Sequence, residues 1–177
     1  MLTSLVITMA RVSRLVLLAS FPILFGWAQA PSEAARTAQL TITGDVSSPL
    51  TLKTEDLEKM PRQTVTVSDQ DGTRVTYEGV LLRDVLEKAG APFGKQLRGK
   101  NLASYVLAKA HDGYQVVFTL AEMDPAFGNE SIIVADKRDG KALFGYQGPL
   151  RLICANDQAG ARSVRMLEIV ELVRLLK

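Results

Sequence analysis

The chain has 177 residues, 47% of them hydrophobic, and carries 21 Lys and Arg against 19 Asp and Glu. Cys154 and His111 are its only cysteine and histidine, which excludes a zinc site built from several Cys and His side chains of one chain. The small positive excess comes from Arg11 and Arg14, and no basic run contains interleaved aromatic residues. We therefore expect no nucleic-acid partner.

Residues 1–30 are predicted to be an export signal. Arg11 and Arg14 precede an apolar run over 15–27, and Ala28-Gln29-Ala30 fits a small-x-small cleavage site. The alternative is a retained anchor, but the run is shorter than the roughly 20 residues that a membrane span needs. We expect a periplasmic or secreted protein that meets a membrane only through an uncleaved signal, with a linker over 31–38 and one domain over 39–177.

The first half of this domain alternates strand and helix signals. Alternating apolar and polar residues predict strands at 40–43, 50–52, 64–68 and 73–77. A short helix is predicted from Thr54 until Pro61 ends it, and apolar residues at helical spacing predict a second from Leu81 to Ala89. Gly90 then provides the C-cap of that second helix.

The second half is dominated by β-type patterns. Strands are predicted at 104–108, 115–119, 131–135, 150–154 and 164–173, with a single helical turn at 120–123. The sum is an α+β fold, β-rich, with mixed, barrel-like sheets and one or two short helices.

Clustered carboxylates do not form a recognisable catalytic or metal-binding pattern. Asp69-x-Asp71-Gly72 matches the start of a calcium loop, but the position of its last ligand is Val80, so a hairpin turn is favoured. Two further pairs lie in polar, turn-like sequence and are expected to be solvated: Glu122 with Asp124, and Asp136 with Asp139.

The two rare side chains have alternative interpretations. His111 lies in a turn beside Asp112 without a nucleophile nearby, so it is retained as a candidate ligand-binding residue and no catalytic residue is assigned. Cys154 ends an apolar strand and is expected to be a buried small hydrophobe. The alternative is a thiolate metal ligand or redox site, which would need exposure and nearby positive charge.

An anion site is predicted in the last third of the chain. Arg151 follows Gly148 and Pro149, and Arg162, Ser163 and Arg165 follow Gly160. Guanidinium groups match the oxygens of phosphate or sulfate in bidentate geometry. The alternative is that these arginines alternate outward from edge strands.

Several ordered motifs carry a resemblance to a known family. They are Gly44-Asp45-Val46, Pro49-Leu50-Thr51-Leu52, Met60-Pro61, Gly79-Val80-Leu81-Leu82, Asp112-Gly113-Tyr114, Asp139-Gly140-Lys141-Ala142-Leu143, Gly148-Pro149-Leu150-Arg151-Leu152 and Arg162-Ser163-Val164-Arg165. In this order the chain resembles the oxidoreductase molybdopterin-binding domain of the sulfite oxidase type over residues 40–172. The resemblance implies that family's fold and a pterin or anion pocket, but not sulfite oxidation. No cofactor is assigned, and molybdopterin is the one that the resemblance allows.

The chain departs from the family at the metal ligand. In catalytic members a Cys thiolate binds molybdenum, from the segment between the Met-Pro and Gly-Val-x-Leu motifs. Here that segment is 62–78, which contains no Cys, and Cys154 falls in a different strand. The sequence therefore predicts a short member that lacks the metal-ligand Cys.

Three functions follow as alternatives. The first is a non-catalytic or minimal exported member that binds a small anionic ligand or a protein partner. The second is a molybdenum-cofactor oxidoreductase with an atypical ligand, such as an oxygen of Asp69 or Asp71. The third is a component that docks on a redox or secretion partner through a sheet face.

Overall fold

The computed structural model describes residues 38–69 and 71–175. The predicted signal and residues 31–37 of the predicted linker lie outside this range. The strands of the described part are β1 (Gln39–Gly44), β2 (Leu50–Lys53), β3 (Arg62–Ser68), β4 (Arg74–Leu81), β5 (Ser104–Ala110), β6 (Gln115–Thr119), β7 (Ile132–Arg138), β8 (Lys141–Ala142), β9 (Arg151–Cys154) and β10 (Leu167–Arg174). Its α-helices are α1 (Thr54–Glu58), α2 (Leu82–Lys88) and α3 (Leu120–Met123). Its 3-10 turns are η1 (Gly94–Gln96), η2 (Gly99–Ala103), η3 (Gly145–Gln147) and η4 (Gly160–Arg162).

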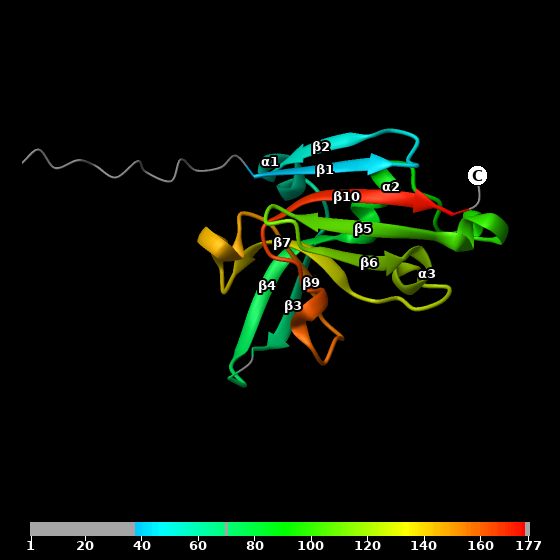
Figure 1. Ribbon diagram of the computed structural model, residues 1–177. Coiled ribbons are helices and arrows are strands. Elements are labelled where there is room, and N and C mark those ends of the chain that lie inside the picture. Colours follow the sequence, from blue (N-terminus) through cyan, green and yellow to red (C-terminus); the bar gives the residue numbers. More distant parts are fainter. Residues whose placement is uncertain (1–37, 70, 176–177) are drawn as a thin grey trace, which may run out of the picture. The chain divides into compact units, whose positions relative to one another are not determined.

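The first sheet has five strands in the order β2-β1-β10-β5-β6. Only the β1–β10 pair is parallel, and it sets Ile42 beside Val170. The last strand of the chain therefore lies in the middle of this sheet, between β1 and β5 (Figure 1). Because residues alternate across a strand, Leu40 and Ile42 of β1 face inward while Gln39 and Thr41 face outward.

The second sheet is built on β7. Strands β3, β4 and β7 follow one another, and both β8 and β9 pair with β7. The β3–β4 hairpin extends away from the first sheet (Figure 1). Its two strands are the predicted hairpin of residues 64–68 and 73–77, lengthened at the ends away from the turn, to residue 62 in β3 and residue 81 in β4.

The main core lies between the two sheets. The first sheet contributes residues such as Val106, Phe118 and Val170, and the second contributes Val134 and Leu152. The helices add the residues that repeat on one face of each, among them Leu57, Leu82, Val85, Leu86, Leu120 and Met123. Burial of these side chains supplies the main favourable free energy of folding.

A smaller cluster covers the other face of the second sheet. It contains Val75 and Tyr77 of β4, Ile133 and Ala135 of β7, and Leu143 of the loop after β8. Arg151 of β9 shares this face because it lies two residues from Ile153, which also packs in the cluster. The main core and this cluster thus place Tyr77 and Arg151 on the side of the second sheet away from the first.

The predicted class, a β-rich α+β fold with mixed sheets, is confirmed. The described residues contain three short α-helices rather than one or two, because the predicted helical turn at 120–123 forms α3 in addition to α1 and α2. The two sheets stay open and do not close into one barrel. The predicted end of α2 is also observed, since Gly90 has a φ of +83° and follows the helix.

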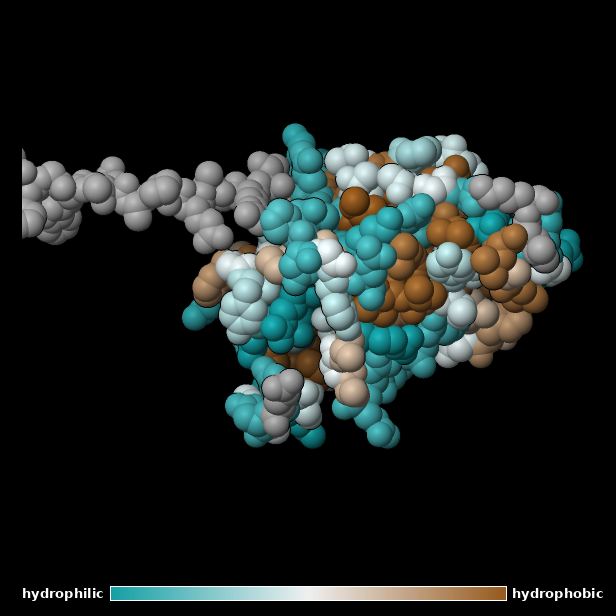
Figure 2. Space-filling model, in the orientation of Figure 1, coloured by the Kyte–Doolittle hydropathy of each residue, from teal (hydrophilic) through white to brown (hydrophobic). Residues whose placement is uncertain are grey.

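The outer face of the first sheet is partly apolar. Figure 2 shows a brown hydrophobic patch over β5 and β6, and Val117 of β6 is 50% exposed. None of the helices in the described residues combines the length and the apolar character that crossing a membrane requires.

Candidate functional site

A surface cleft of about 800 Å³ opens where three loops meet. Ser68 and Asp69 come from the tip of the β3–β4 hairpin, and Asp112 and Tyr114 come from the β5–β6 turn. The loop after β9 supplies the rest: residues 158–161, Ser163 and Arg165. We call this space the Arg165 cleft. Two residues of the predicted anion site, Ser163 and Arg165, therefore line one cavity.

The two carboxylates of the Arg165 cleft are engaged by neighbouring groups. Asp69 accepts a hydrogen bond from Arg138 Nη2 at 3.3 Å. Asp112 Oδ1 accepts the backbone N–H of Tyr114 at 3.0 Å, and the Tyr114 hydroxyl donates to the carbonyl of Ala161 at 2.7 Å. Arg165 is an exposed cation in the same lining, and within the described residues it forms no ion pair.

Three arginines gather around two tyrosine rings. The guanidinium carbon of Arg151 lies 5.3 Å from the centroid of Tyr77, and that of Arg138 lies 6.0 Å from the same ring. Arg165 lies 5.2 Å from the ring centroid of Tyr146. Such contacts hold a cation by the negative face of the ring without neutralising its charge. We call these five residues the arginine–tyrosine cluster.

Arg151 is the cation of this cluster with the least compensation. Its Nη1 donates to the Tyr77 hydroxyl at 2.9 Å and to the side chain of Gln147, while its buried Nε has no hydrogen-bond partner. In the part of the chain that the structure describes, it forms no ion pair with a carboxylate. Burial is the main cause that lowers the pKa of Arg151, and the nearby charges of Arg165 and Arg138 also lower it, whereas Tyr77 and Asp69 act in the opposite direction.

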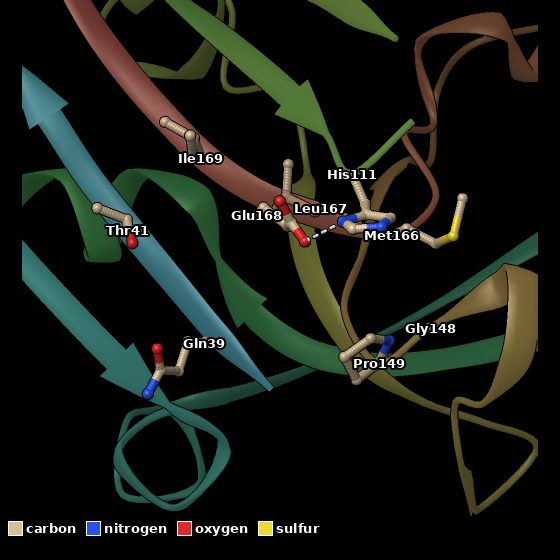
Figure 3. A pocket seen from close by; sticks show the side chains of 9 residues that line it. All are labelled: Gln39, Thr41, His111, Gly148, Pro149, Met166, Leu167, Glu168 and Ile169. Atoms are coloured by element: carbon tan, nitrogen blue, oxygen red, sulfur yellow. Dashed lines mark hydrogen bonds and ion pairs between the residues drawn. The ribbon is translucent and has the colours of Figure 1, made fainter. Parts of the chain in front are cut away.

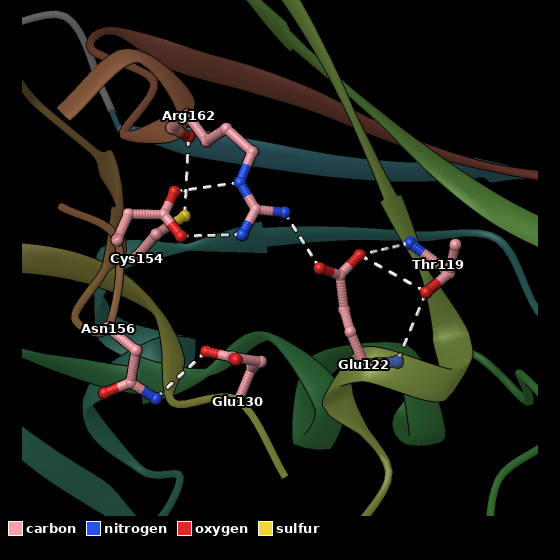
Figure 4. A network of polar contacts seen from close by, with 7 residues as sticks. Thr119, Glu122, Glu130, Cys154, Asn156 and Arg162 are labelled. Atoms are coloured by element: carbon pink, nitrogen blue, oxygen red, sulfur yellow. Dashed lines mark hydrogen bonds and ion pairs between the residues drawn. The ribbon is translucent and has the colours of Figure 1, made fainter. Parts of the chain in front are cut away.

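Arg162 lies outside the lining of the Arg165 cleft. Its Nε and Nη2 donate to the two oxygens of Asp157 at 2.8 and 2.7 Å, and its Nη1 donates to Glu122 Oε2 at 2.8 Å (Figure 4). These bonds raise the pKa of Arg162, and the hydrogen bonds with Asp157 are the largest cause of this rise. The structure therefore gives Arg162 two internal carboxylates, whereas the sequence grouped it with Arg151 and Arg165.

Cys154 is buried as predicted, with 5% of its surface exposed. Its thiol lies 3.6 Å from the carbonyl oxygen of Arg162, and its backbone N–H donates to Ser163 Oγ at 3.1 Å. Burial raises the pKa of the Cys154 thiol to about 12, and the charge of Asp157 adds to this shift. The side chain is therefore a protonated core thiol at neutral pH.

His111 belongs to a different cavity. It lines a cleft of about 490 Å³ together with Glu168, Gln39, Thr41 and Pro149, on the outer side of β1 and β10 (Figure 3). His111 Nδ1 lies 2.6 Å from Glu168 Oε1, and both side chains are about half exposed. The structure therefore separates His111 from the arginines with which it was grouped.

The expectation of solvated carboxylates is wrong for two of the four residues. Asp124 is buried and accepts the backbone N–H groups of Gly94 and Ala126 at 2.6 and 2.8 Å. Asp136 is buried and accepts two hydrogen bonds from Arg62. A carboxylate is tolerated in the interior when such donors satisfy it. Arg62 lies 74 positions from Asp136 and Gly94 lies 30 positions from Asp124, so a local pattern could not reveal these two partners.

A thiolate-bound metal does not fit these residues. Cys154 is a protonated thiol inside the core, and residues 38–69 and 71–175 bring together no group of three or more His, Cys, Asp or Glu side chains that could hold a metal ion. An oxyanion fits the Arg165 cleft better, because Arg165 lines it as an exposed cation that forms no ion pair within the described residues.

Sequence patterns did not identify Tyr77, Tyr146, Gln147 or Arg138 as neighbours of the anion site. Tyr77 is part of an alternating strand pattern that signals only a half-buried strand. Tyr146 and Gln147 lie in η3, which has no periodic signal. Only the pairing of β4, β7 and β9 brings these side chains together.

Comparison with known proteins gives two similarities. The sequence profile of the oxidoreductase molybdopterin binding domain matches residues 27–175. The fold resembles the crystal structure of the sulfane dehydrogenase SoxCD from Paracoccus pantotrophus, with a TM-score of 0.59 and 21% sequence identity. That alignment covers 76% of this chain and 38% of the SoxCD chain, so the chain spans well under half of that relative. No curated protein sequence matches the chain.

Proposed function

The chain belongs to the oxidoreductase molybdopterin-binding domain family, and from this premise we propose that it is an exported, non-catalytic or minimal member that binds a small anionic ligand in the Arg165 cleft. The family accounts for the fold. The missing thiolate supports a role that requires no metal–sulfur bond. A protein partner from redox or secretion chemistry remains part of this proposal.

The observation that carries the proposal is the charge of Arg165, which lines the cleft and forms no ion pair among the described residues. Arg151 does not line the cleft, but its charge adds to that of Arg165. A partly buried guanidinium normally has a carboxylate partner, because a desolvated charge without one is costly. Arg151 donates one hydrogen bond to the Tyr77 hydroxyl and one to the Gln147 side chain, and its Nε has no partner. A second cation, Arg165, lies close enough to lower the pKa of Arg151. An oxyanion bound beside Arg165 would offset this repulsion.

Export is proposed on the sequence of residues 1–30 alone. Its positive region, apolar run and small-x-small site are those of a cleaved signal. The consequence would be a periplasmic or secreted domain. The lack of any pair of cysteines is compatible with this location, because the domain depends on its core rather than on disulfides.

A second candidate is a molybdenum-cofactor oxidoreductase with an oxygen ligand. It is favoured by one observation: Asp69, in the segment where the family carries its Cys, lines the Arg165 cleft. Asp71 is less suitable, because its carboxylate accepts the backbone N–H of Thr73 within the hairpin turn.

The anion site is tested by titrating the purified protein with inorganic sulfate and phosphate at constant ionic strength. We expect both anions to raise the melting temperature, since a ligand that binds only the folded state stabilises it. Arg165→Ala should abolish this rise. Arg98→Ala is the control: it removes another exposed arginine, which lies outside the cleft, and the rise in melting temperature should persist in this variant. An equal rise in wild type and Arg165→Ala would reject the site.

The two candidates are separated by the metal content of protein purified from its native host. Elemental analysis should find no stoichiometric molybdenum, and fluorescence of the oxidised extract should find no pterin. Stoichiometric molybdenum that is lost in Asp69→Asn would instead establish the oxidoreductase.

A further inference from the structure

The loop between β9 and β10 supplies most of the lining of the Arg165 cleft, yet it contains little regular structure. Apart from the single 3-10 turn η4, residues 155–166 contain no helix or strand. The loop nevertheless carries Ser163 and Arg165 to the cleft. Backbone hydrogen bonds hold its last residues, because the carbonyl of Val164 accepts the N–H of Leu152 at 2.8 Å and that of Met166 accepts the N–H of His111 at 2.9 Å. The residues before Ser163 are held largely by side-chain contacts.

Arg162 provides most of these contacts, and they reach three separate elements. The fork to Asp157 closes the loop on itself, and the bond to Glu122 joins the loop to α3. The guanidinium carbon also lies 5.2 Å from the ring centroid of Phe118 in β6. Glu122 is itself held, because its Oε1 accepts the backbone N–H of Thr119 at the start of α3 (Figure 4). Both partners of the Arg162–Glu122 bond are therefore hydrogen-bonded to further groups.

The same residue closes the loop over the core. Its carbonyl oxygen lies 3.6 Å from the Cys154 thiol, and the hydroxyl of the next residue, Ser163, accepts the backbone N–H of Cys154. Residue Cys154 is only 5% exposed in this arrangement. The position of Arg162 therefore couples the shape of the cleft to the protection of Cys154.

We infer that Arg162 is a positioning residue: its fork to Asp157 and its bond to Glu122 hold the β9–β10 loop so that Ser163 and Arg165 face the ligand. Arg162 itself does not contact the ligand. The effect on the ligand rests on the proposed anion site, whereas the effect on the loop is measurable without any ligand.

The side-chain chemistry explains why an arginine is required. A planar guanidinium presents several N–H donors in a fixed geometry and can serve two carboxylates at once while stacking on a ring. A lysine keeps the charge but offers one compact ammonium group. Arg162→Lys should therefore loosen the loop without removing its charge.

Two measurements test the inference on folded protein. The first is the rate at which a thiol reagent labels Cys154, which reports local opening of the loop. The second is the sulfate concentration that gives half of the rise in melting temperature. Hydrogen bonds to charged groups stabilise a structure more than neutral ones do. The loss of such bonds in Arg162→Lys should therefore increase both the labelling rate and the half-maximal sulfate concentration about tenfold or more. Asp157→Asn breaks the same fork from the other side and serves if Arg162→Lys fails to fold.

The matched control is Arg62→Lys. Arg62 also makes a two-bond fork to a carboxylate, that of Asp136, and its side chain is 29% exposed against 35% for Arg162. This variant should lower the free energy of unfolding but leave the sulfate response unchanged. The thiol reagent should label Cys154 in this variant no faster than the loss of global stability accounts for.

The outcomes separate this inference from the proposed function. If Arg162→Lys and Arg62→Lys label Cys154 equally fast after correction for global stability, Arg162 does not hold the loop. If labelling accelerates but the sulfate response is unchanged, Arg162 holds the loop without positioning the site, and the inference is overturned. If wild type shows no sulfate response, the proposed anion site fails and the positioning role fails with it.

Discussion

The chemical role of each arginine depends on which acidic groups the fold places beside it. Arg162 meets Asp157 and Glu122 and becomes a structural anchor. Arg151 meets Tyr77 and Gln147, which leave its charge uncompensated. Arg165 stacks on Tyr146 at the surface. Three identical side chains within a short stretch of sequence therefore have three different electrostatic environments.

The thiol of Cys154 predicts a specific dependence of stability on pH. Its folded pKa of about 12 lies above the ordinary value of 9.0, so the folded state binds this proton more tightly than the unfolded state does. The resulting stabilisation is complete below about pH 9 and is lost as the pH rises from there toward 12. The slope of this contribution reaches about 1.4 kcal/mol per pH unit.

Urea unfolding of wild type and Cys154→Ala at several alkaline pH values measures this contribution. Other groups titrate in the same range in both proteins, so only the difference between the two is informative. The stability of wild type should decrease more steeply than that of Cys154→Ala above about pH 9. Parallel curves would show that the thiol ionises as easily in the folded state as in the unfolded state.

At the scale of the elements, the second sheet depends on a close approach of two strands. A Cβ atom on Gly79 of β4 would lie 2.0 Å from the carbonyl oxygen of Val134 in β7. The register of this pair also shifts between Glu78 and Gly79. The pairing of β4 with β7 carries Tyr77 to the arginine–tyrosine cluster, so this glycine contributes indirectly to the site.

Gly79→Ala should therefore destabilise the domain by about 3 kcal/mol, because a backbone atom cannot move aside as a flexible side chain can. Gly160→Ala is the control, since a Cβ there meets no atom within 4 Å; its effect should stay within about 0.5 kcal/mol. Both values come from urea unfolding at equilibrium. Equal free energies of unfolding for the two variants would mean that β4 and β7 can move apart at Gly79 without loss of stability.

At the scale of the whole molecule, the first sheet joins the beginning and the end of the domain. Strand β10 lies between β1 and β5 and pairs with both. Its inward residues Leu167, Val170 and Leu172 are fully part of the main core. The central strand is thus the last strand in the described part of the chain, and the core is incomplete without it.

A chain ending at Met166 should consequently show no cooperative unfolding transition. It loses the middle strand of the first sheet together with these three core residues, and the remaining strands cannot pair across the gap. A chain ending at Arg174 keeps all of β10 and should unfold in urea much as the full chain does. Circular dichroism during urea titration distinguishes them. A cooperative transition in the shorter chain would contradict this account of the core.

The local sequence was sufficient for most elements. Strands β1 to β7, β9 and the helix α2 follow from period-two alternation and from apolar spacing with a glycine cap, because these signals depend only on neighbouring residues. The β-rich class followed from the number of such strands. The final strand was predicted from residue 164, whereas β10 begins at Leu167, because Met166 has a φ of +48°, which is outside the extended region.

The sequence by itself determined the fold class, the family resemblance and the absence of a cysteine between residues 62 and 78, since all three are properties of residue order. Only the tertiary structure decided that Arg151 and Arg165 share one region while Arg162 and His111 do not, and that Asp124 and Asp136 are buried. Charge compensation acts through space, and the partners of these groups lie up to 74 positions away along the chain. A linear pattern carries no information on such distances.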